Sequence, residues 1–158
     1  LPEGITVQAA GANLSIVADP TDPTQKVFKV ECNNPSDGKN VYTYLNVGMQ
    51  FSAGETYVVT YKIMPLTDYA GNSFKDTIIG GNFRYGTTAA NSFKDHTFDM
   101  ASNKSTSSEW IEITVTVGVP TNYSAGGADC FQIWGKFSPE SGLGISYLVK
   151  DISVTLKY

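Results

Sequence analysis

Residues that commonly carry out catalysis are sparse in this sequence. His96 is the single histidine, so a metal site or a catalytic triad built on two or more histidines is excluded. A Ser-His-Asp triad would need His96, which lies among polar residues with no nucleophile-elbow motif around it. The sequence contains neither a Walker phosphate-binding loop nor a dinucleotide-binding fingerprint. We therefore interpret His96 as a surface histidine in a loop.

Carboxylates are the remaining candidates for acid–base chemistry, because a pair of them can hydrolyse a glycosidic bond. Glu109 and Glu112 flank Trp110 on an expected strand. A position on a solvated sheet face explains these two glutamates at least as well as a catalytic role does. The aspartates are mostly expected in turns: Asp19, Asp22, Asp37, Asp68, Asp95 and Asp99. We predict no catalytic residue, and we place a small glycanase or lyase behind the binding functions described below.

Aromatic and amide side chains indicate binding instead. Planar aromatic rings stack on the polarised C–H face of a sugar ring, while amides and charged groups bond its hydroxyls. In segment 130–137, Phe131 and Ile133 mark an apolar face, so Trp134 belongs to the opposite face. The same alternation in segments 41–47 and 81–85 gives further candidates, and Tyr85 is added because it lies at the end of its strand near an expected rim of the binding groove. The predicted carbohydrate-binding residues are Trp134, Tyr42, Tyr44, Gln132, Arg84, Tyr85, Asn46 and Asn82, with Lys136 beside them.

Each of these residues also has a structural explanation. A tryptophan in a β-sandwich is often a packing residue, and we expect Trp110 in the core. Tyrosines such as Tyr42 and Tyr44 occur on sheet surfaces without a function, and Arg84 can be a solvated charge. A β-bulge would shift the register by one residue and exchange the two faces.

The segment 51–65 gives the clearest strand signal in the chain. After a turn that contains Gly54, side chains alternate with a period of two, which is typical of a strand with one face in a core. One face carries Tyr57, Val59, Tyr61 and Ile63, and the other carries Val58, Thr60, Lys62 and Met64. Pro65 has no N–H to donate, so the strand should end there. We predict a central strand of an antiparallel sheet.

Short strands separated by turns make up the rest of the pattern. Residues 4–19 predict one or two strands, and residues 19–24 predict a loop because they contain two prolines and two aspartates. Further strands are expected at 26–32, 41–47, 77–85, 110–117, 130–137 and 148–156, and no segment keeps a helical period over ten residues. The sequence Asn-Ser-Phe-Lys-Asp occurs at 72–76 and 91–95, which we attribute to local duplication or chance in a hairpin region. Nine or ten short strands predict a β-sandwich.

Length and composition bound the class of protein. A chain of 158 residues is long enough for one domain, and we predict a single domain over residues 1–158. The 41% hydrophobic and 12% aromatic content indicates a globular chain. A net charge of −4 with no basic patch argues against nucleic-acid binding. No apolar run approaches the length of a membrane span.

The N-terminal residues and the two cysteines bear on the cellular compartment of the protein. Residues 1–4 have neither the basic start nor the apolar core of a signal peptide, so a secreted protein would be represented here by a mature fragment or an excised domain. Cys32 and Cys130 match no metal-binding spacing. Their parity places them on opposite faces, which favours two free thiols over a disulfide bridge.

Three segments resemble, in the right order, the jelly-roll carbohydrate-binding modules of families 4, 9, 16 and 22. The turn and strand of 51–65 are similar to the family's glycine-turn, Thr-Tyr and strand segment. Residues 108–115 (SEWIEITV) resemble its tryptophan-containing strand, and residues 147–154 (YLVKDISV) resemble its C-terminal strand. The resemblance extends from about Lys26 to the end of the chain and implies a jelly roll with a concave binding sheet.

The resemblance also implies a binding site and a metal. In this family aromatic ligands lie on strands that correspond to those carrying the candidates above. Many members hold a structural calcium ion with oxygen ligands near both termini. Asp151 matches the family's C-terminal aspartate, whereas the N-terminal ligand segment is missing and Glu3 is a poor substitute. A structural Ca²⁺ at Asp151 is therefore an expectation, and no cofactor is required.

Together these features predict a non-catalytic module that binds a single β-linked polysaccharide chain, xylan first and β-glucan second. Its partners would be the oligosaccharide and a tethered glycoside hydrolase domain, and its location extracellular or on the cell surface. The alternative is a structural or adhesion β-sandwich that binds another protein. In that case Trp134, Tyr42 and Tyr44 should lie on different faces.

Overall fold

The structure is a computed structural model of the chain, and it describes residues 5–8, 12–32, 41–66, 78–85, 91–99, 109–137 and 145–158. Every regular element in these ranges is a β-strand. The strands are β1 (Ile5–Gln8), β2 (Ala12–Asp19), β3 (Asp22–Cys32), β4 (Val41–Gly48), β5 (Thr56–Pro65), β6 (Ile78–Tyr85), β7 (Asn91–Asp99), β8 (Ile111–Gly118), β9 (Cys130–Phe137) and β10 (Ile145–Leu156). The described part of the chain contains no helix that could span a membrane.

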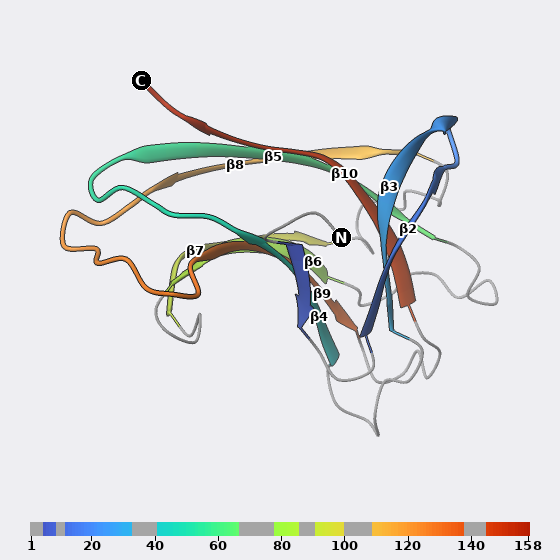
Figure 1. The fold of residues 1–158 in the computed structure, drawn as a ribbon, viewed down its shortest axis with the longest axis horizontal. Helices are drawn as coiled ribbons and strands as arrows, with labels where there is room; N and C mark the ends of the chain where they lie inside the picture. The colour runs from blue at the N-terminus through green and yellow to red at the C-terminus, as the bar shows by residue number, and fades with distance from the viewer. Residues whose placement is uncertain are drawn as a thin grey trace.

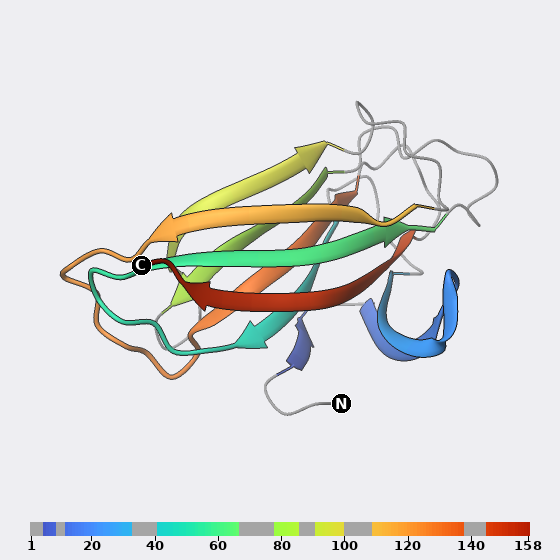
Figure 2. The same ribbon diagram turned by 90° about the horizontal axis from the view of Figure 1, so that it is seen from above.

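The strands form two five-stranded sheets. Sheet A has the order β1-β4-β9-β6-β7 and sheet B the order β2-β3-β10-β5-β8, and the paired strands run antiparallel. The sheets lie as two layers, with β5, β8 and β10 above β4, β6 and β9 (Figure 1). Seen from above, β2 and β3 curl away from the plane of β5, β8 and β10 (Figure 2). The predicted all-β antiparallel sandwich is confirmed, while its concave binding face and its single-domain boundaries stay predictions.

Strand β5 lies between β10 and β8, as expected for a central strand. Its side chains alternate as predicted: Val59, Tyr61 and Ile63 are fully buried, and Pro65 ends the strand. Gly54 has φ +79° in the preceding turn, a left-handed conformation that favours glycine. The Gly54 N–H donates to the carbonyl oxygen of Val119 at 3.1 Å, which joins this turn to the end of β8.

The turn between β2 and β3 is tighter than predicted. The sequence predicted a loop over 19–24; a turn is present but only at residues 20 and 21, because β2 extends to Asp19 and β3 begins at Asp22. Two aspartates close the turn: Asp19 Oδ1 accepts from the N–H of Thr21 at 2.8 Å, and Asp22 Oδ1 accepts from the hydroxyl of Thr24 at 2.7 Å. The first of these bonds satisfies a backbone N–H that a ladder would otherwise pair.

The main core lies between the sheets. Sheet A contributes Leu45, Phe83, Phe131 and Ile133, and sheet B contributes Val30, Val59, Tyr61, Ile63 and Val149. Aromatic rings pack within and between the layers: the centroids of Phe83 and Phe131 on sheet A lie 5.1 Å apart, and Tyr61 of sheet B lies 5.9 Å from Phe131 across the core. Contacts of this kind are worth about 0.5–1.5 kcal/mol each beyond the area they bury.

The hydroxyl of Tyr61 is buried in this core without a hydrogen-bond partner. Burial, with the nearby Tyr147, raises the pKa of the Tyr61 phenol well above its usual value. An unsatisfied buried polar group costs about 1–3 kcal/mol. We therefore expect Tyr61→Phe to raise the free energy of unfolding by about 1 kcal/mol, measured by urea denaturation.

Tyr57 on the same strand provides the matched control. Its hydroxyl oxygen accepts a hydrogen bond from the N–H of Ser52 at 2.9 Å. Tyr57→Phe removes the same atom but breaks a bond, so it should lower the free energy of unfolding by about 0.5–1.5 kcal/mol. Equal destabilisation by Tyr61→Phe and Tyr57→Phe would contradict the conclusion that the Tyr61 hydroxyl has no hydrogen-bond partner.

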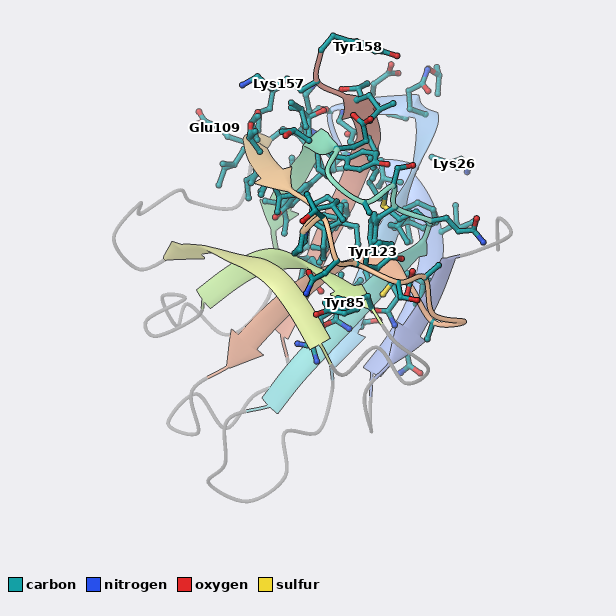
Figure 3. The ribbon with its side chains drawn as sticks, turned by 90° about the vertical axis from the view of Figure 1, so that its left-hand side faces the viewer. Lys26, Tyr85, Glu109, Tyr123, Lys157 and Tyr158 are labelled. Atoms are coloured by element: carbon teal, nitrogen blue, oxygen red, sulfur yellow. The ribbon has the colours of Figure 1, made fainter. Side chains whose placement is uncertain are left out.

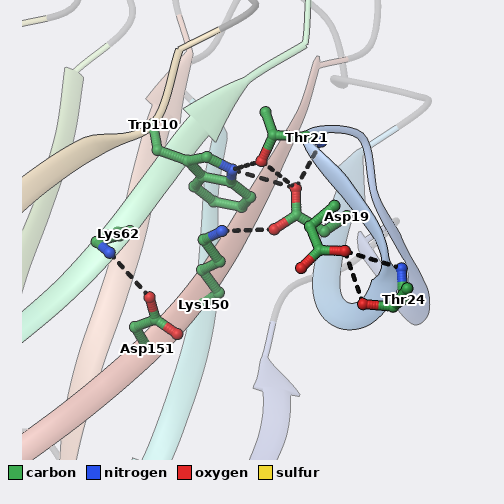
Figure 4. Close-up of polar contacts among 8 residues, drawn as sticks. Asp19, Thr21, Thr24, Lys62, Trp110, Lys150 and Asp151 are labelled. Carbon is green, nitrogen blue, oxygen red and sulfur yellow. Dashed lines mark hydrogen bonds and ion pairs between the residues drawn. The ribbon is translucent and has the colours of Figure 1, made fainter.

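A second, smaller apolar cluster covers the outer face of sheet B. Val27, Met64 and Leu148 form it, and the half-buried Trp110 packs against them. The indole Nε1–H lies 3.2 Å from Asp19 Oδ1 and 3.1 Å from Thr21 Oγ1 (Figure 4). Trp110 is thus a packing residue, but it lies over the outer face of sheet B instead of in the core between the sheets.

Asp19 and Lys150 form an ion pair beneath this tryptophan. The Asp19 side chain is fully buried, and its Oδ2 lies 2.5 Å from Lys150 Nζ, which in turn lies 4.3 Å from the centre of the Trp110 ring. Burial alone would raise the pKa of Asp19. The hydrogen bonds from Lys150, Thr21 and Trp110 outweigh it and hold the pKa well below its usual value.

This depressed pKa predicts an acid-sensitive contribution to stability. Because an aspartate in an unfolded chain titrates at pH ~3.9, the unfolded chain binds this proton first as the pH falls. The contribution is therefore fully present above about pH 5 and is lost as the pH falls toward the folded pKa. We expect the free energy of unfolding to decline more steeply between pH 5 and pH 2 in the wild type than in Asp19→Asn. Identical pH profiles in urea denaturation would contradict this assignment.

Candidate functional site

The outer face of sheet A carries most of the predicted binding positions. Leu45, Phe83, Phe131 and Ile133 are fully buried on the core side of β4, β6 and β9. Strand side chains alternate, so the neighbouring positions belong to the opposite face. By backbone register these are Tyr42, Tyr44 and Asn46 on β4, Gln132, Trp134 and Lys136 on β9, and Asn82 and Arg84 on β6.

Cross-strand register arranges these positions in rows across the sheet. Gln132 is paired with Asn46 on one side and with Asn82 on the other. The next row pairs Trp134 with Tyr44 and with Gly80. Positions two residues apart on one strand share a face and lie about 6.6 Å apart, so an aromatic row and an amide row run side by side across neighbouring strands. Tyr42 pairs with Lys136 in the row beyond, and Arg84 pairs with Cys130 at the other end.

Gln132 is the best-defined side chain of the amide row. It is 5% exposed, and its Nε2 donates a hydrogen bond to Asn46 Oδ1 at 2.8 Å. A buried amide needs such a partner, because an unsatisfied one costs free energy. The bond fixes two amides on neighbouring strands and sets their orientation, because Nε2 of Gln132 must face Asn46. The pair therefore offers an ordered set of donors and acceptors.

Tyr85 lies apart from these rows. It has the parity of Phe83, and its half-buried ring makes an edge-to-face contact with Tyr123, with centroids 5.6 Å apart (Figure 3). The hydroxyl of Tyr123 donates to the buried carboxylate of Asp129, which also accepts from the N–H of Gly126 at 3.1 Å. Tyr85 thus belongs to the aromatic contacts at the end of the core, next to the 119–129 loop.

Cys130 at the end of β9 is a buried free thiol. Burial, with a smaller contribution from Asp129, raises the pKa of this thiol to about 11 despite the nearby Arg84. Such a thiol is a poor nucleophile at neutral pH because the thiolate is the reactive form. Cys32 lies on β3 of sheet B, and the expectation of unbridged cysteines is confirmed for Cys130.

Sequence reasoning missed two positions of the amide row. Thr6 on β1 pairs with Asn46, and Asp95 on β7 pairs with Asn82, so the row crosses all five strands of sheet A. Asp95, His96 and Asp99 lie in β7, so assigning them to turns and a loop was wrong. The local sequence carries no strand signal, because NSFKDHTFD has polar residues on both parities; the second Asn-Ser-Phe-Lys-Asp copy opens this strand. The first copy, at 72–76, lies outside the described residues, as do Asp37 and Asp68.

The expected calcium position at Asp151 is poorly suited to a metal ion. Asp151 has φ +53° and lies at a bulge in the pairing of β10 with β5. Its Oδ2 lies 3.1 Å from the ammonium of Lys62, a cation that repels a metal ion. The described ranges contain no group of three or more metal-binding side chains, and Glu3 lies outside them. The calcium ion stays a prediction that these residues do not favour.

A melting experiment tests the metal directly. An ion that binds only the folded chain raises its melting temperature. Since Lys62 already supplies the cation at Asp151, we expect the same melting temperature in calcium and in EDTA. A rise with calcium that is lost in Asp151→Asn would contradict this expectation and restore the calcium site.

No family model and no curated relative match the sequence. Solved structures match the fold. A family 4 carbohydrate-binding module has a TM-score of 0.61 at 17% identity, over 99% of this chain and 96% of that one. The N-terminal cellulose-binding domain of Cellulomonas fimi β-1,4-glucanase C has a TM-score of 0.60 at 18% identity, over 99% and 91%. A Stig cyclase, FisC, from Fischerella sp. TAU has a TM-score of 0.61 at 10% identity, over 99% and 86%.

A multi-domain structure matches over part of its length. The family 22 module and glycoside hydrolase family 10 modules of Clostridium thermocellum xylanase 10B, in complex with xylohexaose, have a TM-score of 0.57 at 13% identity. That match covers 98% of this chain and 26% of the xylanase chain. At these identities the comparisons establish the fold. The chain has the jelly-roll β-sandwich fold that carbohydrate-binding modules of families 4 and 22 share, which confirms at the level of the fold the resemblance drawn from three sequence motifs.

Proposed function

We propose that this chain is a non-catalytic carbohydrate-binding module, and that the outer face of sheet A binds a single β-linked polysaccharide chain. The observation that carries the proposal is the register of two rows on that face, Tyr44–Trp134 beside Asn46–Gln132–Asn82. The fold supports it, because similar structures include a cellulose-binding domain and a module of a xylanase solved with xylohexaose. We place xylan first and β-glucan second.

The two rows suggest how recognition would work. One or two aromatic rings stack on the faces of successive sugar units, and the amides bond equatorial hydroxyls. Gly80 on β6 pairs with Trp134, and because it is a glycine it adds no side chain to the aromatic row. Arg84 and Lys136 at either side can donate to further hydroxyls. Affinity should be modest, on the order of micromolar to millimolar, because water competes for every hydroxyl bond.

The biological role follows from tethering. A module joined to a glycoside hydrolase raises the local concentration of the enzyme on its substrate without any new contact. We propose this role and an extracellular or cell-surface location, which the xylanase example supports as an arrangement of such folds. The chain itself would release no sugar. Reducing-sugar assays on xylan with purified protein test that point, and turnover would contradict it.

The adhesion alternative makes a different prediction about which face of a sheet carries three aromatic positions. It expected Tyr42, Tyr44 and Trp134 on different faces, whereas the register places these three positions on one face of sheet A. Affinity electrophoresis through gels containing xylan, β-glucan or mannan decides between the two functions. We expect retardation by xylan or β-glucan. Unretarded migration in all three gels would overturn the proposed function and favour a protein partner.

A further inference from the structure

Sheet B opens between β3 and β10. The two strands pair from Ile145↔Cys32 to Val149↔Phe28, and their pairing ends at Val149 and Phe28. Beyond Val149 and Phe28, the β3 residues Val27, Lys26 and Asp22 pair with β2, and the β10 residues Lys150 and Ser153–Leu156 pair with β5. Two strand edges therefore face each other without a ladder between them. Backbone donors and acceptors on these edges remain available to water or to a ligand.

A pocket of about 340 Å³ occupies this opening, and we call it the β3–β10 pocket. Its polar lining consists of Asp22, Gln25, Lys26, Lys150 and Asp151. Its apolar lining consists of the buried Val27 and Val149 and the half-buried Phe28. Ligand pockets usually measure about 300–1,000 Å³, so this one suits a small ligand.

The walls of the β3–β10 pocket are held by contacts that do not involve a ligand. Lys150 is fixed by Asp19 on one side and by the Trp110 ring on the other (Figure 4). Asp151 is paired with Lys62, and it lies with φ +53° at the bulge in the pairing of β10 with β5. Asx-type bonds from Thr24 hold Asp22. A pocket with fixed walls loses little entropy when it binds.

Charge balance selects the class of ligand. The carboxylates of Asp19 and Asp151 are matched by the ammonium groups of Lys150 and Lys62. The remaining charges, Asp22 and Lys26, also sum to zero. The pocket thus favours neither an anion nor a cation. Gln25 and Lys26 are exposed, and within the described part of the chain their side chains make no hydrogen bond or ion pair, so they can bond a neutral ligand rich in hydroxyls.

We infer that the β3–β10 pocket is a second carbohydrate site, which takes one or two units of a neutral sugar. Hydroxyls would bond Gln25, Lys26 and the open strand edges, and a C–H face would lie against the half-buried Phe28. This site goes beyond the proposed function and is separate from it, because it lies on sheet B while the aromatic and amide rows lie on sheet A.

Amide chemical shifts in a ¹⁵N-labelled sample test this inference with cellobiose and xylobiose as probes. We expect saturable shifts for residues 25–28 and 149–152. The double variant Gln25→Ala/Lys26→Ala should weaken this binding at least about tenfold, which is ~1.4 kcal/mol. Lys157→Ala, an exposed lysine outside the pocket, is the matched control and should change nothing. Trp134→Ala should leave these shifts intact.

Three outcomes would overturn the second site. They are the absence of saturable shifts at residues 25–28 and 149–152, their persistence in Gln25→Ala/Lys26→Ala, or their loss in Trp134→Ala. Inorganic phosphate that shifts the same amides at lower concentration than the sugars would overturn the neutral-ligand class. Residues on β4 and β9 are followed in the same spectra, so failure of the sheet A site is seen separately from failure of the β3–β10 pocket.

Discussion

Replacing Lys150 with methionine is expected to lower the free energy of unfolding by about 3–5 kcal/mol, the usual cost of breaking a buried ion pair. The lysine side chain is 19% exposed and its partner, Asp19, is fully buried. Methionine preserves the apolar stem against Trp110 but leaves the carboxylate without its cation. Urea denaturation at pH 7 measures the loss, and a fall in melting temperature accompanies it.

Two control variants separate the effect of burying the ion pair from the effect of losing a positive charge. Lys62→Met removes the other ammonium on this face, but its pair with Asp151 is 36% and 57% exposed, so the loss should stay within about 1 kcal/mol. The double variant Asp19→Asn/Lys150→Met removes both charges and should recover part of the stability lost in Lys150→Met. Equal effects of Lys150→Met and Lys62→Met would contradict the buried pair.

Trp134→Ala should remove about 1–3 kcal/mol of polysaccharide binding, on the scale measured for stacking of bases on aromatic rings. That loss, about 5-fold to 150-fold in affinity, takes a modest binder close to the limit of detection. The reason is the position of Trp134 beside Tyr44 on the outer face of sheet A. By register this position lies on the face opposite the core-facing Phe131 and Ile133, so we expect stability to change by about 0.5 kcal/mol or less.

Trp110→Ala is the matched control, since the chain has two tryptophans and the structure places them on different sheets. It should lower the melting temperature, because Trp110 packs on the second cluster and bonds Asp19, and it should leave binding in the gel unchanged. A collapsed melting temperature in Trp134→Ala would instead place Trp134 in a core, and the binding face proposed here would be wrong.

The alternating strands were predictable because each face has one chemical character. Strand β5 and segment 111–117 of β8 have apolar residues on one parity and mostly polar residues on the other, and the structure follows that division. The same rule predicts Gln132 and Asn46 on one face, and their hydrogen bond confirms the shared face. The alternation also gave Tyr85 the parity of Phe83, which explains its packing on Tyr123.

Strand β7 could not be predicted with the same rule. Its sequence, NSFKDHTFD, has polar residues on both parities, and its pairing with β6 shifts register between Asn82 and Arg84. The Asp19–Lys150 pair was also out of reach, because 131 residues separate the partners in sequence. Only the folded hairpin of β2 and β3 brings Asp19 under Trp110. Long-range ion pairs of this kind leave no local pattern.

Diffraction from crystals soaked with xylohexaose tests the central claim most directly. The predicted result is a sugar chain over the outer face of sheet A, with one ring stacked at Trp134 and hydroxyls within hydrogen-bond distance of the Gln132 and Asn46 amides. A soak with cellohexaose then ranks xylan against β-glucan. An oligosaccharide bound elsewhere on the molecule, with the Tyr44–Trp134 and Asn46–Gln132–Asn82 rows left bare, would contradict the proposed binding face.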